Sequence, residues 1–148
     1  MTLYFEDLRP GDTYDLGEVA VDADEMVDFA RRYDPQPFHV DPVAAKESSF
    51  GELIASGWYT ISLFMRLYVD GLLADSTSQG SAGGDEFRWL APVRAGDLLT
   101  GRLVVVEARP SATRPDRGTA LLRGEMLRDG QPVMAVRFYG LFGRRPAA

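Results

Sequence analysis

Apolar positions along the chain follow two different spacings, one in each half. Between residues 22 and 73 they recur at the spacing of an α-helix, three and four residues apart. After residue 85 they gather into short runs rich in Val, Leu and aromatic residues, separated by Gly, Pro and Asp. Helices followed by successive strands predict an α+β domain with an antiparallel sheet.

The first helix is predicted to begin after Asp22. Asp22 and Glu25, three residues later, together resemble a capping box. Pro35 disfavours helical geometry at Asp34, so the helix is expected to stop near residue 33. Its apolar stripe is expected to contain Met26, Phe29, Ala30 and Tyr33.

A second, longer helix is predicted from Gly57 to about Leu73. Apolar residues occupy nearly every face of it, which is typical of a helix buried in a core. With fewer than twenty residues, and with Arg66 and Asp70 inside it, this segment is expected to be a core helix and not a membrane span.

Strands are predicted over residues 86–90, 98–108, 119–127 and 133–142, with a further short strand over 14–21. Asp129-Gly130 is a hairpin turn signal between the last two. No internal repeat or linker divides the chain, so residues 1–148 are expected to form a single domain. The sheet is expected to curl around the long helix.

Composition narrows the classes of function. With a net charge of −6, the chain is not expected to have the positively charged surface that binds nucleic acid. The N-terminus lacks the basic start and apolar run of a signal peptide, and no apolar run reaches membrane-spanning length. The chain has no cysteine, which excludes disulfides and thiol catalysis. These features favour a cytoplasmic protein without a membrane or nucleic-acid partner.

The segment 34–42, DPQPFHVDP, is expected to be a stiff loop, because three prolines fix its backbone. It contains His39, the one histidine of the chain, five residues after Asp34. A histidine and a carboxylate in a rigid turn can grip a water molecule and exchange its protons near neutral pH. The alternative is structural: a hydrogen-bonding histidine and an aspartate that shapes a turn.

The start of the long helix is a second candidate. Backbone N–H groups there have no partner within the helix, and Gly57 leaves its own N–H open to a carbonyl that gains negative charge. The alternative is that Ser56 is simply the N-cap and Gly57 a packing requirement. One histidine and no cysteine predict no metal site. Together the two features suit addition of water to a double bond conjugated with a carbonyl, the reverse elimination, or thioester hydrolysis.

Four segments resemble one known family. DPQPFHVD, residues 34–41, resembles the D-x-N-P-x-H-x-D motif of MaoC-like (R)-specific enoyl-CoA hydratases. IASGW, residues 54–58, is similar to that family's entry into its central helix, and FRWLAPVRAGD, residues 87–97, to its R-F-L-x-P-V-x-x-G-D segment. FEDLRPGD, residues 5–12, fits its usual N-terminal opening.

The resemblance implies a hotdog fold, an antiparallel sheet wrapped around the long helix, paired as a homodimer or higher oligomer. It implies reversible hydration of a trans-2-enoyl-CoA to an (R)-3-hydroxyacyl-CoA, the CoA thioester being substrate and no cofactor being needed. Asp34 and His39 match the residues that activate water, and the Gly57 N–H matches the oxyanion donor. Substrate contacts are expected from Gln36, Ser56, Trp58 and Tyr59.

Some residues depart from the family pattern. Gln36 stands in place of Asn and Ser56 in place of a frequent His, which bears on substrate choice. Arg88 and Arg94 are candidate phosphate contacts, with solvation at the surface as the favoured role.

Two other functions stay open. A hotdog thioesterase places a carboxylate on or near the central helix, where Asp70, toward the far end, is the one acidic residue well inside. The other is a non-catalytic acyl-CoA-binding or partner subunit.

Overall fold

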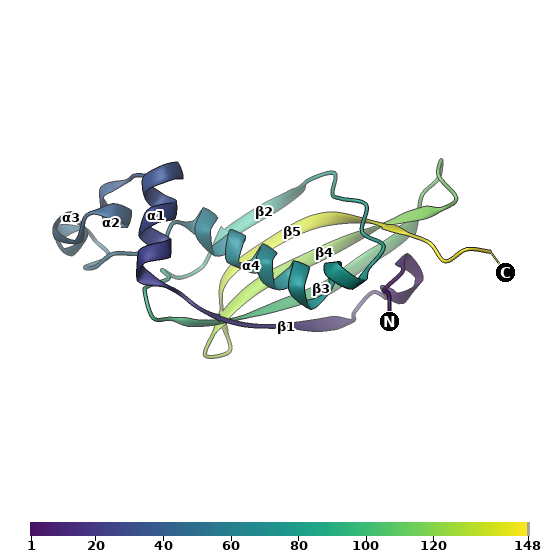
Figure 1. Ribbon diagram of the computed structural model, residues 1–148, viewed down its shortest axis with the longest axis horizontal. Helices are drawn as coiled ribbons and strands as arrows, with labels where there is room; N and C mark the ends of the chain where they lie inside the picture. Colours follow the sequence, from purple (N-terminus) through teal and green to yellow (C-terminus); the bar gives the residue numbers. More distant parts are fainter. Residues whose placement is uncertain (148) are drawn as a thin grey trace.

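The computed structural model describes residues 1–147 as one antiparallel sheet with a long helix along one of its faces (Figure 1). The sheet has five strands in the order β1-β3-β4-β5-β2, and every neighbouring pair is antiparallel. The predicted α+β architecture is therefore confirmed. The strands span β1 Thr13–Ala20, β2 Gly84–Trp89, β3 Leu98–Pro110, β4 Arg117–Arg128 and β5 Gln131–Gly143.

Every predicted strand is present, with ends that differ by a few residues. Asp129 and Gly130 both have positive φ, 51° and 77°, and join β4 to β5 as the turn signal predicted. Strand β2 lies at one edge of the sheet, and all six of its residues are exposed. An edge strand of this kind leaves backbone N–H and C=O groups free to pair with another chain.

Helix α1, Ala23–Tyr33, starts and stops where the sequence predicts. The Asp22 carboxylate accepts a hydrogen bond from the Glu25 N–H, 2.9 Å, so half of the predicted capping box is present. The other half was predicted wrongly, because the Glu25 carboxylate accepts from the Tyr59 hydroxyl instead, 2.5 Å. Tyr33 was also placed wrongly in the buried apolar stripe, because this last residue of α1 is 71% exposed.

The segment predicted as a loop is partly helical, which corrects the prediction. It contains α2, Pro37–Val40, and is followed by α3, Pro42–Glu47. Each helix begins with a proline, whose fixed φ suits the first helical position and whose missing N–H is not needed there. The expected stiffness of this segment therefore comes from two short helical turns as well as from its prolines.

Helix α4, Gly57–Gly71, ends earlier than predicted and is followed by the 3-10 turn η2, Leu73–Asp75; a similar turn, η1, spans Phe5–Asp7. The expectation that α4 is buried on nearly every face was wrong: part of its apolar surface is exposed in this chain. One face packs on the sheet, while Trp58 and Met65 are 51% and 46% exposed. Within residues 1–147, no helix combines the length and apolar character needed to cross a bilayer.

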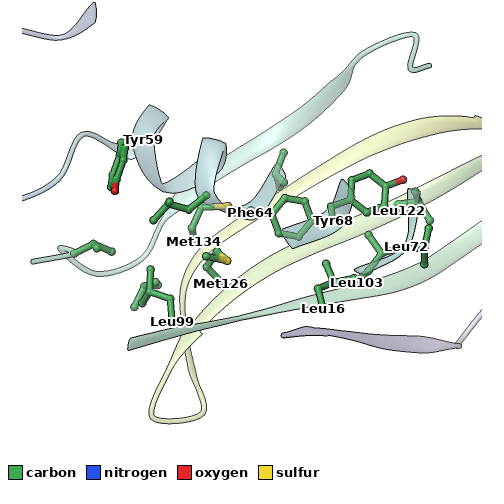
Figure 2. Close-up of a cluster of buried hydrophobic side chains, with 14 of the residues drawn as sticks. Leu16, Tyr59, Phe64, Tyr68, Leu72, Leu99, Leu103, Leu122, Met126 and Met134 are labelled. Carbon is green, nitrogen blue, oxygen red and sulfur yellow. The ribbon is translucent and has the colours of Figure 1, made fainter. Parts of the chain in front are cut away.

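The core lies between α4 and the sheet (Figure 2). Phe64 and Tyr68 project from the helix, and their rings stack with centroids 5.8 Å apart. The facing strands contribute fully buried side chains, Leu99, Leu103, Leu122, Met126 and Met134. Apolar burial of this extent holds α4 in one position relative to the sheet, which also places the helix N-terminus.

Gly124 of β4 marks the closest approach of helix and sheet. A Cβ at this position would lie 2.3 Å from Cζ of Phe64, which is 3% exposed. Gly124→Ala is therefore expected to push Phe64 off its site and to lower the free energy of unfolding by about 1–3 kcal/mol, as overpacking usually does.

Urea unfolding followed by circular dichroism measures this change. Thr100→Ala, on the exposed face of β3, is the matched control, expected to change the free energy by less than roughly 0.5 kcal/mol. Equal urea midpoints for Gly124→Ala and wild type would show that the helix is not held this tightly.

Candidate active site

Asp34 ends α1 and turns its carboxylate toward the start of α4. Its backbone N–H bonds the Ala30 carbonyl, 2.8 Å, which closes the last turn of the helix. Oδ1 accepts a hydrogen bond from Gln36 Nε2, 2.7 Å, and Oδ2 accepts one from Ser56 Oγ, 2.7 Å. Both carboxylate oxygens are thus held by donors from different parts of the chain.

His39, in α2, lies beside this carboxylate. Its side chain is only 6% exposed, and Nε2 is 3.3 Å from Asp34 Oδ2. On the other side of the ring, Nδ1 lies 2.8 Å from the Ile54 carbonyl oxygen. A carbonyl can only accept, so Nδ1 carries a hydrogen, and Nε2 is the ring nitrogen that faces the carboxylate.

A cavity of about 440 Å³ opens in front of these two groups. Asp34, His39 and Gly57 all line it, so the structure brings together the three residues predicted to do chemistry. Three larger hollows lie elsewhere and contain neither His39 nor Gly57: two around α1, about 770 and 910 Å³, and one of about 600 Å³ near the C-terminus. The smaller cavity is therefore the candidate site.

Gly57 is the first residue of α4, and its N–H bonds no acceptor within residues 1–147. The preceding Ser56 caps the helix, because its Oγ accepts from the Trp58 N–H, 3.3 Å, while donating to Asp34. A Cβ on Gly57 would lie 2.1 Å from Nε1 of Trp89, so no other residue fits here without moving the indole. The small residue keeps both the N–H and the cavity open.

The four predicted substrate contacts divide into two groups. Gln36 and Trp58 line the cavity, and the Trp58 ring meets Trp89 edge to face, 5.3 Å between centroids. Ser56 is fully buried behind Asp34 and holds the carboxylate. Tyr59 is buried among the core side chains, with its hydroxyl on Glu25, and is not among the cavity-lining residues.

Opposing effects act on the Asp34 carboxyl. Burial raises its pKa, whereas the hydrogen bonds from Gln36 and Ser56 and the nearby His39 lower it. The lowering effects win, and the pKa lies below the ordinary value. Asp34 is therefore a carboxylate at neutral pH and can accept a proton.

Several lining residues were not predicted from the sequence. The rings of Phe38 and Phe50 meet at 55°, with centroids 5.3 Å apart, and Phe38 also forms an edge-to-face pair with His39. Most of the remaining wall is apolar and suits a hydrocarbon group. It includes Ile54, Thr60, Trp89, Leu90 and Val93.

Leu90 and Val93 could have been predicted as lining residues, because they lie in residues 87–97, one of the four segments that resemble the family. Thr60 is three residues after Gly57, a spacing that puts both on one helix face. No group of three or more His, Asp or Glu side chains suited to a metal ion occurs within residues 1–147.

Arg94 and Arg88 lie outside this cavity. The Arg94 guanidinium pairs with Glu52, and Arg88 lies on the exposed edge strand β2. Arg88 is exposed there, whereas the Arg94 side chain is only 35% exposed.

Ser56→Ala removes one donor from the Asp34 carboxylate and is expected to raise the pKa of Asp34. A carboxylate whose folded-state pKa is depressed stabilises the fold above its unfolded pKa, and that contribution is lost as the pH falls through the folded value. The difference in free energy of unfolding between wild type and Ser56→Ala should therefore be largest near pH 7 and shrink as the pH falls below about 4.

Urea unfolding at several pH values measures this gap. Ser62→Ala removes a hydroxyl that bonds the Trp58 carbonyl, 2.8 Å, away from any carboxylate, and serves as the pH-independent control. A gap for Ser56→Ala that does not vary with pH would mean that Ser56 has no effect on the ionisation of Asp34.

Comparison with known proteins adds family relationships to this geometry. Residues 6–122 match the family model of the MaoC like domain. The 3-hydroxybutyryl-CoA dehydratase of Methylorubrum extorquens is 31% identical over 139 residues, which cover 90% of this chain and 84% of that protein. The chain spans only 30% of protein MaoC of Klebsiella aerogenes and 50% of nodulation protein N of Rhizobium meliloti, with 32% and 38% identity over 68% and 52% of this chain.

Solved structures agree with the fold. The MaoC-like dehydratase of Rhodospirillum rubrum superposes with a TM-score of 0.89 at 39% identity, over 98% of this chain and 99% of that one. A Mycobacterium tuberculosis protein described as a double hotdog fold superposes with a TM-score of 0.81 at 16% identity, over 99% and 46% of the two chains. The predicted hotdog fold is thereby confirmed. With a family model that matches most of its length, the chain belongs to the MaoC-like dehydratase family.

Proposed function

We propose that the protein catalyses the reversible hydration of a trans-2-enoyl-CoA to an (R)-3-hydroxyacyl-CoA. The observation that carries this proposal is the shared cavity of Asp34, His39 and Gly57. It presents a carboxylate and an imidazole nitrogen 3.3 Å apart and a free backbone N–H at a helix N-terminus. The CoA thioester is the substrate, and the proposed reaction needs no cofactor.

The pairing of Asp34 with His39 favours a water molecule as the reactant. When the ring is neutral, Nε2 and the carboxylate oxygen are both acceptors, and neither can donate to the other. Water has two hydrogens and can satisfy both acceptors at once. A water held in this way has its oxygen lone pairs directed away from the pair and toward the cavity.

In the proposed reaction, the water oxygen forms a bond to C3 of the enoyl group. The electron pair of the C2–C3 double bond moves toward the thioester, whose oxygen gains negative charge. The Gly57 N–H and the positive end of the α4 dipole stabilise that charge. The proton removed from water through Asp34 and His39 is delivered to C2, so that one water is added in total.

Known relatives support this class of substrate. The Methylorubrum relative is named for a 3-hydroxybutyryl-CoA dehydratase activity, and its similarity covers most of both chains. The apolar wall that includes Phe50 and Ile54 suits a hydrocarbon group.

A hotdog thioesterase is the second candidate, and the position of Asp70 disfavours it. Asp70 is one residue from the end of α4, and its carboxylate bonds Arg66 one turn earlier, 2.8 Å, on the exposed face. It does not line the cavity of Asp34 and His39. A non-catalytic acyl-CoA-binding role is the third candidate, for which binding without turnover would be the sign.

Crotonyl-CoA tests the proposal directly. We expect loss of the conjugated enoyl thioester absorbance without release of free thiol, and abolition of that loss in Asp34→Ala. Asp24→Asn, an exposed carboxylate on the same helix, is the control expected to retain activity. Release of free CoA would favour the thioesterase, and tight binding without either change would favour the binding role.

His39→Ala is expected to lower kcat for hydration by roughly 10²–10⁴-fold, the usual contribution of a positioned acid or base. Steady-state kinetics with crotonyl-CoA measure the change, and circular dichroism shows whether the variant folds. A folded His39→Ala enzyme with near wild-type kcat would remove this ring from the mechanism.

We also propose that two copies pair through the edge of β2. Its backbone is free to extend the sheet, and the aromatic side chains of Phe87, Trp89 and Trp58 are 44–51% exposed next to one another. Aromatic side chains exposed together are typical of an interaction surface. Trp58 and Trp89 also line the cavity, so a partner at this edge would lie next to the site.

Light scattering at micromolar concentration is expected to give at least the dimer mass. Phe87→Asp, a change outside the cavity lining, is expected to shift the population toward monomer by burying a charge in the interface. Thr100→Ala on the exposed face of β3 serves again as the control. A wild-type protein of monomer mass would contradict the pairing.

A further inference from the structure

The 92–97 loop, which lies between β2 and β3, forms part of the wall of the candidate cavity. Pro92 and Val93 line the cavity, and Val93 is only 4% exposed. The loop belongs to no helix or strand, so no regular ladder of backbone hydrogen bonds fixes its shape. Its position must therefore come from individual contacts with other parts of the chain.

One of these contacts joins the loop to the segment just before α4. The Val93 carbonyl accepts a hydrogen bond from the Ala55 N–H, 2.7 Å. Ala55 is only 6% exposed, and a buried N–H that loses its partner is costly. The loop and residues 54–56 are therefore expected to move together.

Residues 54–56 hold both members of the acid–base pair. The Ile54 carbonyl bonds His39 Nδ1, 2.8 Å, and the Ser56 hydroxyl bonds Asp34 Oδ2, 2.7 Å. Nε2 of His39 is 3.3 Å from that same carboxylate oxygen. The geometry of the pair therefore depends on residues 54–56, and through them on the loop.

Arg128, the last residue of β4, fixes the loop to the sheet. Its Nη1 donates to the Pro92 carbonyl, 2.9 Å, and to Oδ2 of Asp97, 2.6 Å. These acceptors lie at opposite ends of the loop, so one guanidinium nitrogen closes it. The side chains of Arg128 and Asp97 are only 26% and 20% exposed, which makes this charge-assisted contact stronger than an ion pair in open solvent.

Asp97 also connects the loop to the start of α1. Its carboxylate accepts from the Arg94 N–H within the loop, 2.9 Å. Its backbone carbonyl accepts from the N–H of Val21, 2.8 Å, the residue before the Asp22 cap. The loop therefore contacts the segments that precede both α1 and α4.

Loss of the Arg128 guanidinium would leave two acceptors facing one another. Neither the Pro92 carbonyl nor the Asp97 carboxylate can donate a hydrogen bond to the other. Their oxygens would repel each other, and the loop would be expected to open at this point.

We propose that Arg128 is a positioning residue, which holds His39 and Asp34 in their relative geometry through the 92–97 loop. Arg128 does not itself line the cavity. This inference rests on the proposed function for its effect on the reaction rate, whereas its effect on His39 is measurable without any substrate.

The ring of His39 reports the geometry directly, because it is the only histidine of the chain. In protein without a histidine tag, nitrogen-15 spectra at about pH 8.5, where a free imidazole is neutral, show which ring nitrogen carries the hydrogen. Wild type is expected to carry it on Nδ1, which faces the Ile54 carbonyl. Arg128→Met, which keeps the length of the side chain without its donors, should shift the ring toward a mixture of both tautomers. Arg128→Lys keeps a cationic donor and should retain the wild-type signals.

Arg102→Met is the matched control. Arg102 also pairs with a shielded carboxylate, that of Glu125 at 3.0 Å, but it lies in β3 and has no contact with the loop. Its loss is expected to lower the thermal unfolding temperature because Glu125 is only 6% exposed, while the His39 signals stay those of wild type. Equal changes in the His39 signals of both variants would mean a general loss of stability and would overturn the positioning role.

Kinetics with crotonyl-CoA give the second readout. Arg128→Met is expected to lower kcat/KM roughly 10-fold, less than the ~10²-fold that a misplacement of about 1 Å can cost. The acid limb of the kcat/KM profile should also move to higher pH, because a loosened Ser56 donor lowers the pKa of Asp34 less. Arg102→Met should leave the acid limb where wild type has it.

Asp97→Asn is the second variant, and it decides the question if Arg128→Met does not fold. It keeps the shape of the side chain and removes its charge, so smaller changes of the same kind are expected in the His39 signals and in kcat/KM. Thermal unfolding shows which variants are folded.

The outcomes separate this inference from the proposed reaction. Altered His39 signals in Arg128→Met or Asp97→Asn, with no hydration by wild type, would retain the positioning role and overturn the hydratase. Hydration by wild type, with His39 signals and kcat/KM unchanged in the folded variants, would overturn the role of Arg128 alone.

Discussion

The hydrogen bond from Ser56 to Asp34 is the constraint on which the site depends. It joins Asp34, the C-cap of α1, to Ser56, the N-cap of α4, which lies 22 positions later in the chain. The Ser56 Oγ and the Asp34 Oδ2 are 2.7 Å apart. The same hydroxyl accepts from the first turn of α4, so one side chain fixes both the carboxylate and the helix start. His39 is tied to the same segment through the Ile54 carbonyl. Three elements therefore meet with little freedom to separate.

This arrangement divides the cavity into two chemical sides. Asp34 and His39 provide acceptors, and the lowered pKa of Asp34 keeps the carboxylate ionised at neutral pH. The start of α4 provides a donor, the free N–H of Gly57. Addition of water to a conjugated thioester needs acceptors for the hydrogens of the water that approaches C3, and a donor for the thioester oxygen. The proposed hydration matches that polarity.

Helix α4 serves the fold and the site with different parts of its surface. Its buried face, through Phe64 and Tyr68, packs on the sheet and fixes the height and rotation of the helix. Its N-terminus then points into the cavity at a position set by that packing. Because Gly124 allows the close approach of Phe64, a residue in the middle of the sheet contributes to the placement of a group at the far end of the helix.

The sequence by itself determined the class of fold and the order of the elements, and it singled out Asp34, His39 and Gly57 as candidate site residues, because periodicity, caps and short motifs are local properties of the chain. Local patterns could not separate a buried face of α4 from an exposed one, since apolar residues occupy both. They could not predict that Tyr59 donates to Glu25 or that Ser56 donates to Asp34. Those facts depend on contacts between residues far apart in the chain, which only the packing of α1 and α4 on one sheet decides.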